Sequence, residues 1–151
     1  MIKGLSYLVV GADCLVGRSL LQVLRERGHD AYGTSRREES LGTRCVYLDL
    51  HNSDSFKPPE SVGYVFVVAA ISKYDQCEKD PLARETNVVF IPRFISALLQ
   101  QNLFVTFIST NAVFGGGVPW PHENASKDPR IPYANQKHEA ETGILAVAKR
   151  M

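Results

Sequence analysis

The chain has 151 residues, of which 44% are hydrophobic and 22% charged, as in ordinary soluble globular proteins. Its formal net charge of +1 gives no reason to expect a nucleic-acid or membrane partner, and no apolar run is long enough to span a bilayer. The three cysteines are scattered, without a CxxC pair or a metal-ligand cluster, so we expect reduced thiols, a cytoplasmic location and no metal site. We therefore expect one domain over residues 1–151.

The first half of the chain alternates short apolar runs with one helical pattern. Strands are expected over residues 5–10, 30–34, 44–48 and 64–69, and a short helix or loop over 52–58. A helix after the first strand is expected to place one apolar face inward and to close at Gly28; the face comprises Val16, Leu20, Leu21 and Leu24. The run at 64–69 is almost continuously apolar, which is typical of a central parallel strand covered on both faces.

The second half continues the alternation. Pro81 opens a long helix that runs to Leu98, and Pro92 inside it is expected to kink it. A fifth strand over 103–108 and a Gly- and Pro-rich loop over 115–132 precede a last helix that begins at Tyr133. This order predicts an α/β fold with a doubly wound parallel sheet of the Rossmann type, in which ligands bind beyond the carboxyl ends of the strands.

The first strand-to-helix turn reads GADCLVG over residues 11–17. A dinucleotide site needs a tight turn, close approach of the backbone to a pyrophosphate, and a helix N-terminus aimed at it. Gly11 can supply the turn and Gly17 the close packing of helix on strand, whereas Cys14 stands where a middle glycine is expected. The alternative is a plain strand-to-helix turn with two incidental glycines.

The end of the second strand indicates the type of dinucleotide. An NAD site usually has an Asp or Glu there to hold the ribose hydroxyls. This chain has Ser35, Arg36 and Arg37 instead, and a guanidinium can pair with a 2′-phosphate. We therefore expect a preference for NADP(H), with NAD(H) as the second choice; the alternative is that both arginines form a solvated charged turn.

Tyr133 and Lys137 stand four residues apart, which places them one turn apart on the same helix face. A phenol titrates near pH 10, and a neighbouring ammonium favours the phenolate, so the pair can move a proton near neutral pH. The hydroxyl of Thr110, upstream at the end of an apolar run, can hold the substrate oxygen that gains or loses the proton. An isolated match of this spacing is more often an exposed helical pair.

These motifs, taken in order, resemble the extended short-chain dehydrogenase/reductases. The resemblance covers essentially the whole chain and is carried by the turn at 11–17, AAISKYDQCEKDP at 69–81, Asn87, STNAVFGG at 109–116 and YANQK at 133–137. The second and fourth of these stretches are most similar to the dTDP-4-dehydrorhamnose reductase branch. The family normally continues into a C-terminal substrate region that is not recognisable here, so we expect a fragment or a naturally short relative.

The resemblance implies a role for each matching position. Thr110, Tyr133 and Lys137 would be catalytic, and Thr110, Asn111 and Glu123 would contact substrate. The cofactor-binding positions would be Gly11, Asp13, Cys14, Leu15, Val16, Gly17, Ser35, Arg36, Arg37, Asp49, Leu50, Ala69, Ala70, Ile71, Asn87, Ser109, Tyr133 and Lys137. Two of these have a local alternative, because Asp49 can cap the following segment and Asn87 can be satisfied within its own helix.

The resemblance further implies an NADP-dependent oxidoreductase that acts on a 4-keto nucleotide-sugar. An epimerase or a dehydratase of the same superfamily would share these residues, although Asn111 and Ala112 offer no acid of the kind that dehydratases usually add. A non-catalytic NADP-binding regulatory module is the alternative from another class. A homodimer through the long helix and the Tyr-bearing helix is expected from the resemblance.

Overall fold

The computed structural model describes residues 5–117 and 119–149 and contains two compact units that interleave along the chain. The first unit comprises Met1–Ala69 and Phe94–Ile108, and the second comprises Ala70–Arg93 and Ser109–Met151. The glycine-rich turn belongs to the first unit, whereas Thr110, Tyr133 and Lys137 belong to the second.

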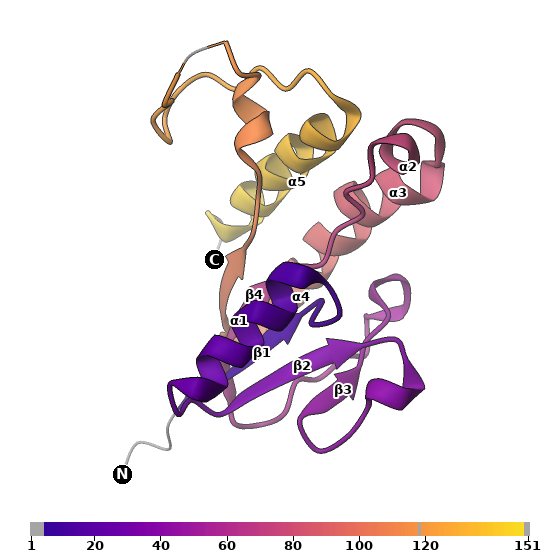
Figure 1. The fold of residues 1–151 in the computed structure, drawn as a ribbon, viewed down its shortest axis with the longest axis vertical. Coiled ribbons are helices and arrows are strands. Elements are labelled where there is room, and N and C mark those ends of the chain that lie inside the picture. Colours follow the sequence, from indigo (N-terminus) through magenta and orange to yellow (C-terminus); the bar gives the residue numbers. More distant parts are fainter. Residues whose placement is uncertain (1–4, 118, 150–151) are drawn as a thin grey trace. The chain divides into compact units, whose positions relative to one another are not determined.

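A parallel sheet of five strands forms the centre of the first unit (Figure 1). Its strands are β1 (Ser6–Val10), β2 (Ala31–Ser35), β3 (Cys45–Tyr47), β4 (Val62–Val67) and β5 (Phe104–Phe107), in the order β3-β2-β1-β4-β5. The chain moves outward from β1 in one direction through β2 and β3 and in the other through β4 and β5. The carboxyl end of β1 is therefore the switch point at which such sheets bind ligands. All five predicted strands and the Rossmann-type α/β fold are confirmed, although β4 begins and ends two residues earlier than predicted.

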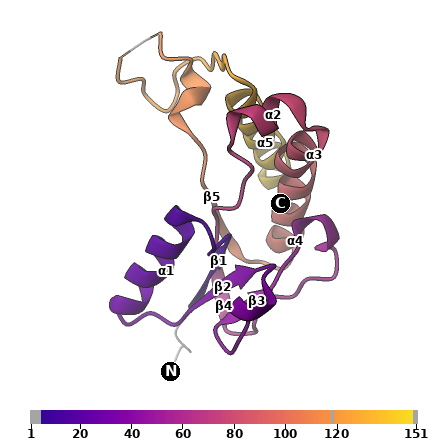
Figure 2. The same cartoon turned by 45° about the vertical axis from the view of Figure 1, so that its right-hand side comes forward.

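Helices cover both faces of this sheet (Figure 2). α1 (Leu15–Glu26) covers one face, where Leu24 packs with Val9 and Ala31. Side chains alternate along a strand, so Leu8, Val10, Val65 and Val67 point to the opposite face. That face is covered by the part of α4 (Ile91–Gln100) that supplies the buried residues Phe94, Ile95 and Leu98.

One residue of the predicted apolar face of α1 is placed differently. Leu20, Leu21 and Leu24 pack inward as predicted, but Val16 is 55% exposed. Gly17 is the buried residue of this first turn. It packs so closely on the preceding strand that an added Cβ would collide with the carbonyl oxygen of Gly11. The close approach of helix to strand at Gly17 thus turns Val16 outward.

The second unit is helical. It contains α2 (Tyr74–Lys79), α3 (Pro81–Glu85), the π-helical segment η3 (Thr86–Phe90), the 3-10 segment η4 (Asn111–Phe114) and α5 (Pro132–Ala148). Two further 3-10 segments, η1 (Glu38–Ser40) and η2 (Leu50–Asn52), belong to the first unit. The sequence did not predict α2, and η2 begins two residues before the predicted segment at 52–58.

The long helix predicted from Pro81 is continuous to Gln100, and Pro92 is accommodated by a π-helical turn. Pro92 has no N–H for the carbonyl of Val88, and its ring would collide with that carbonyl in a regular α-helix. In η3 the ladder widens, and the N–H of Ile91 reaches the carbonyl of Thr86 five residues back. Such π-helical turns are one of the established ways in which a helix absorbs an irregularity.

Candidate active site

The glycine-rich turn has the close contacts that require glycine. Gly11 has a φ of +92°, and a Cβ there would lie 2.8 Å from the backbone nitrogen of Ala69. Gly17 packs against the carbonyl of Gly11 and has no room for a side chain. The packing of helix on strand thus needs a glycine at both positions, and the binding of a dinucleotide at this turn stays a prediction.

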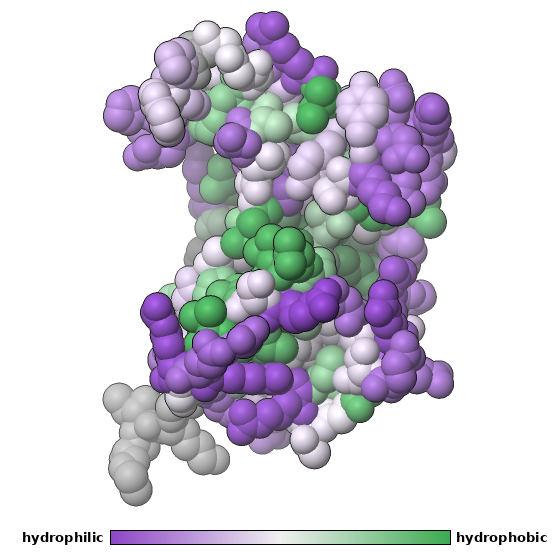
Figure 3. Space-filling model, in the orientation of Figure 1, coloured by the Kyte–Doolittle hydropathy of each residue, from purple (hydrophilic) through white to green (hydrophobic). Residues whose placement is uncertain are grey.

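Cys14 caps the helix that follows this turn. Its backbone is extended, with φ −80° and ψ 164°, a conformation that requires no glycine. Its Sγ accepts a hydrogen bond from the N–H of Gly17 at 3.3 Å. The thiol thus serves as the N-cap of α1, where hydrophobic side chains gather on the surface and where Leu15 is 77% exposed (Figure 3).

The N-terminus of α1 has backbone N–H groups of the kind that attract anions. The first N–H groups of a helix have no partner within the helix and attract anions. Cys14 accepts the hydrogen bond of the Gly17 N–H, and the first turn of α1 contains no acidic side chain. The N–H groups of Leu15 and Val16 are therefore the ones that a phosphate would contact. Contact of Leu15 and Val16 with a pyrophosphate, which the resemblance implies, stays a prediction.

The end of β2 is tied to the same turn. The hydroxyl of Ser35 donates to a carboxylate oxygen of Asp13 at 2.7 Å and accepts from the N–H of Arg37 at 2.9 Å. Arg36 and Arg37 are exposed. The Ser35 hydroxyl is thus hydrogen-bonded to Asp13 and Arg37, and neither hydrogen bond was predicted from the sequence.

Asp49 has the local role that was the alternative for it. It is the N-cap of η2 and accepts from the N–H of His51 at 3.2 Å and from Nδ2 of Asn52 at 3.2 Å. Leu50 follows it, half-buried, as the first residue of η2. Contact of Asp49 and Leu50 with adenine stays a prediction.

Asn87 connects three segments of the second unit. Its Oδ1 accepts from the N–H of Ile71 at 3.0 Å, and its Nδ2 donates to the carbonyl of Ile71 at 2.8 Å and to Oε1 of Gln136 at 2.8 Å. Gln136 in turn donates to the carbonyl of Cys77 at 2.9 Å, and the Cys77 thiol donates to the carbonyl of Ile71 at 3.2 Å. Asn87 is therefore not satisfied within its own helix, and it holds the backbone that follows Ala70 against α5.

We expect Asn87→Ala to lower the free energy of unfolding by about 3 kcal/mol. The substitution removes the hydrogen-bond partner of the buried Gln136 Oε1 and of both the N–H and the carbonyl of Ile71. Urea unfolding followed by circular dichroism measures the change. The matched control is Asn124→Ala, because Asn124 lies exposed in a turn of the loop after η4 and its backbone is not left-handed. Equal stability of Asn87→Ala and the original chain would show that Ile71 does not depend on this amide.

Tyr133 and Lys137 lie one turn apart on α5, with Tyr133 half-buried and Lys137 only 1% exposed. Burial, followed by the electrostatic effect of Cys77, raises the pKa of the Tyr133 phenol. The expected lowering of this pKa by Lys137 is therefore wrong for this structure, because burial disfavours the charged phenolate and Cys77 acts in the same direction. Burial lowers the pKa of Lys137 from 10.5 to about 8, and the opposing effect of Glu141 raises it.

Glu141 contacts a residue that the resemblance gave to the cofactor. The Ser109 hydroxyl donates to Oε1 of Glu141, and Nδ1 of His138 lies 3.9 Å from Oε2. Sequence reasoning missed Glu141, although its place one turn after Lys137 could have drawn attention to it. Ser109 therefore holds the end of the segment before Thr110 against α5, and its contact with cofactor stays a prediction.

Thr110 directly precedes η4 and is positioned by it. Its Oγ1 accepts from the N–H of Ala112 at 3.2 Å as the N-cap of η4, and Thr110 is half-buried. Because the cap uses an acceptor lone pair, the hydroxyl hydrogen can still be donated to a substrate oxygen. Asn111, the next residue, is exposed.

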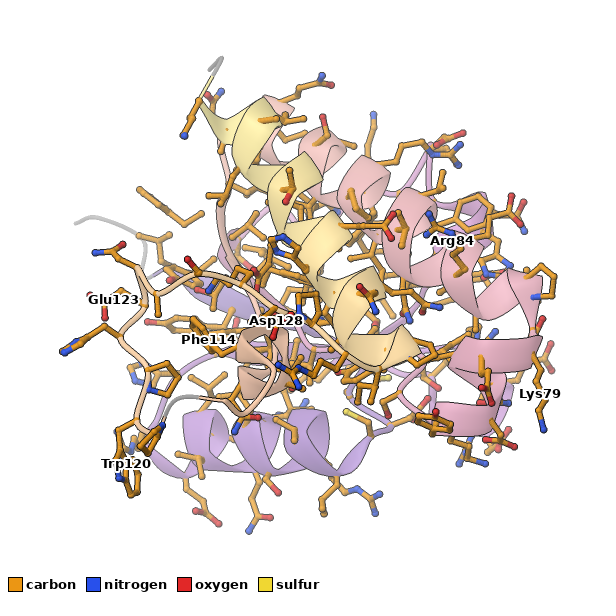
Figure 4. The ribbon with its side chains drawn as sticks, turned by 90° about the horizontal axis from the view of Figure 1, so that it is seen from above. Lys79, Arg84, Phe114, Trp120, Glu123 and Asp128 are labelled. Atoms are coloured by element: carbon orange, nitrogen blue, oxygen red, sulfur yellow. The ribbon has the colours of Figure 1, made fainter. Side chains whose placement is uncertain are left out.

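The loop after η4 is held at Asp128, whereas Glu123 and Trp120 project from its outer part (Figure 4). The N–H of Asp128 donates to the carbonyl of Val113 at 2.9 Å, and Nζ of Lys127 lies 3.7 Å from the centre of the Phe114 ring. Glu123 is exposed, as is Trp120 at 95%. The structure does not bring Glu123 to Thr110, so its contact with substrate stays a prediction.

Within residues 5–117 and 119–149, no group of three or more His, Cys, Asp or Glu side chains could hold a metal ion. Over the same residues, no helix is both long enough and apolar enough to cross a membrane.

The first unit has the sheet order, switch point and glycine-rich turn of a dinucleotide-binding Rossmann protein. The sequence profile of the NAD dependent epimerase/dehydratase family matches residues 7–151, and the chain belongs to this family. No curated protein matches the chain.

Solved structures agree with this family. The structure of MoeE5 in complex with UDP-glucose and NAD is 28% identical, with a TM-score of 0.80, and the match covers 95% of this chain and 49% of that one. A UDP-glucuronic acid 4-epimerase from Bacillus cereus shares the fold at 21% identity and a TM-score of 0.81, over 96% of this chain and 52% of that one. A dTDP-4-dehydrorhamnose reductase from Clostridium acetobutylicum shares it at 22% identity and a TM-score of 0.75, over 95% and 50%. The chain thus spans about half the length of the structures it matches.

Proposed function

We propose that this chain supplies the dinucleotide-binding turn and the proton-transfer residues of an oxidoreductase that modifies a nucleotide-sugar. The observation that carries the proposal is that α5 presents Tyr133 half-buried and Lys137 buried, one turn apart, in a chain that matches the epimerase/dehydratase family from residue 7 to 151. An exposed helical pair, the alternative reading of this spacing, would not bury the lysine.

Each of the chain's own groups has one task in this proposal. The N-terminus of α1 binds the pyrophosphate, with Gly11 and Gly17 allowing its approach. Tyr133 moves a proton to or from the sugar oxygen, Lys137 holds the ribose and the tyrosine, and Thr110 donates a hydrogen bond to that oxygen. The nicotinamide, when bound, supplies hydride transfer.

Two reactions remain within this class. The sequence resemblance to dTDP-4-dehydrorhamnose reductases favours reduction of a 4-keto sugar, whereas the match to the NAD dependent epimerase/dehydratase family favours an epimerase-type reaction. The structure of MoeE5 in complex with UDP-glucose and NAD favours a UDP-sugar as the substrate. Both need the same three residues, because both add or remove a proton at the sugar oxygen while a hydride moves. The exposed arginines Arg36 and Arg37 favour NADP(H), and the NAD-bound neighbours favour NAD(H).

The test combines two readouts on the full-length protein that carries these residues. UDP-glucose, UDP-glucuronic acid and a dTDP-4-keto sugar are each incubated with oxidised or reduced cofactor. An epimerase changes the sugar's configuration without net consumption of cofactor, and a reductase oxidises one reduced cofactor for each sugar. Dinucleotide binding without turnover of any nucleotide-sugar would instead support a non-catalytic binding module.

Assembly is a separate proposal. We propose a homodimer through the long helix and α5, as the resemblance implies, and sedimentation at increasing protein concentration tests it.

A further inference from the structure

The carboxylate of Asp13 is fixed at the carboxyl edge of the sheet beside the end of β2. β1 and β2 are paired, with Val9 opposite Gly33, so the turn after β1 and the end of β2 lie side by side. Two hydrogen bonds join them: the N–H of Gly11 donates to Oγ1 of Thr34 at 3.1 Å, and the Ser35 hydroxyl donates to Oδ2 of Asp13 at 2.7 Å.

Ser35 is well suited to hold this carboxylate. It is 3% exposed, and its oxygen also accepts from the N–H of Arg37 at 2.9 Å, so its hydrogen is directed to Asp13. A carboxylate can accept about four hydrogen bonds, so the bond from Ser35 leaves capacity for further hydroxyl donors.

The negative charge of Asp13 acts on its surroundings. After burial, it is the second cause that raises the pKa of the Cys45 thiol, on the strand next to β2. The electrostatic potential at the end of β2 therefore depends on Asp13 as well as on Arg36 and Arg37.

We propose that Asp13 selects NAD(H) over NADP(H), in the role usually given to an acid at the end of the second strand. The inference rests on the proposed function, since it presumes a dinucleotide at the turn that follows β1. A ribose diol can donate to the Asp13 carboxylate, as it does to the acid in other NAD sites. A 2′-phosphate at the same place would meet a like charge held by Ser35, and such an encounter is strongly unfavourable.

The test is calorimetric titration of the chain with NADH and, separately, with NADPH. We expect the original chain to bind NADH at least about tenfold more tightly than NADPH. Asp13→Asn keeps the size of the side chain and an oxygen for Ser35 but removes the charge, and we expect it to reduce this ratio about tenfold. Glu26→Gln, at the other end of α1, removes the same charge far from the turn and should leave the ratio unchanged.

Adenosine fragments separate this inference from the function on which it rests. AMP and adenosine 2′,5′-bisphosphate contain the discriminating ribose but no nicotinamide, and the preference should persist with them. Tighter binding of NADPH than NADH, or an unchanged ratio in Asp13→Asn, would overturn the role of Asp13 and leave the dinucleotide site intact. Binding of neither dinucleotide would overturn the proposed function as well.

Discussion

Tyr133→Phe is expected to lower turnover of the nucleotide-sugar by about a thousandfold, the size of a typical general acid–base contribution, and to leave the dissociation constant of the dinucleotide within about threefold. The substitution removes one hydroxyl from a half-buried ring and nothing from the turn at Gly11. The loss should therefore fall on kcat rather than on binding.

The measurement compares kcat and cofactor affinity for Tyr133→Phe and for a matched control. Tyr7→Phe removes a phenol from β1, where the ring packs against His29 in the first unit with centroids 5.1 Å apart. It should leave kcat unchanged. Equal turnover in Tyr133→Phe and the original protein would remove Tyr133 from the mechanism.

The raised pKa of Tyr133 sets the direction of the pH dependence. Because burial and Cys77 keep the phenol protonated beyond its ordinary range, Tyr133 can donate a proton to a carbonyl throughout neutral pH. The rate of reduction should then show no titration of Tyr133 near neutral pH. The rate of the reverse reaction, which needs the phenolate, should increase as pH rises. A rate profile in both directions checks this.

Lys137→Met is expected to stabilise the chain at pH 7 while abolishing turnover. The pKa of Lys137 is lowered from 10.5 to about 8, so the folded chain releases this proton at lower pH than the unfolded chain does. Between about pH 8 and 10.5 the unfolded state binds more protons, and the free energy of unfolding contributed by this group rises with pH. Below that window, burial of the ammonium costs about 3 kcal/mol.

The measurement is urea unfolding of the original chain and of Lys137→Met at pH 7, 8, 9 and 10. Their difference in unfolding free energy should shift by up to about 3 kcal/mol in favour of the original chain as pH rises. Lys79→Met is the control, because Lys79 is exposed and projects from the end of α2 (Figure 4). If the difference in unfolding free energy between the two chains did not change with pH, burial would not lower the pKa of Lys137. A variant that is more stable but inactive is expected when a functional residue is buried at a cost in stability.

The fold could be predicted from the sequence because its strands are short apolar runs bounded by glycine or polar residues. α2 escaped prediction because Tyr74–Lys79 has a single buried residue, Cys77, and no apolar periodicity. The outward position of Val16 followed from the tight packing of Gly17 on Gly11, which a helical period does not encode.

The candidate site was predictable where spacing along one helix decides it, as for Tyr133 and Lys137. Partners across the fold were not predictable. Gln136 bonds to Cys77 over 59 residues, and Ser109 bonds to Glu141 over 32. The raised pKa of Tyr133 depends on burial that only the packing of α5 determines. The bond between Asp13 and Ser35 likewise requires the register of β1 on β2.

Binding of a nicotinamide dinucleotide at the turn after β1 is tested most directly by nuclear magnetic resonance of the isotope-labelled chain during titration with NADH. We predict saturable shifts of the backbone amide resonances of Leu15, Val16 and Gly17, the first residues of α1. We expect no comparable shifts at the far end of α1, around Glu26. Unchanged resonances at this turn at saturating NADH, or shifts confined to other parts of the chain, would contradict the dinucleotide site and the function proposed from it.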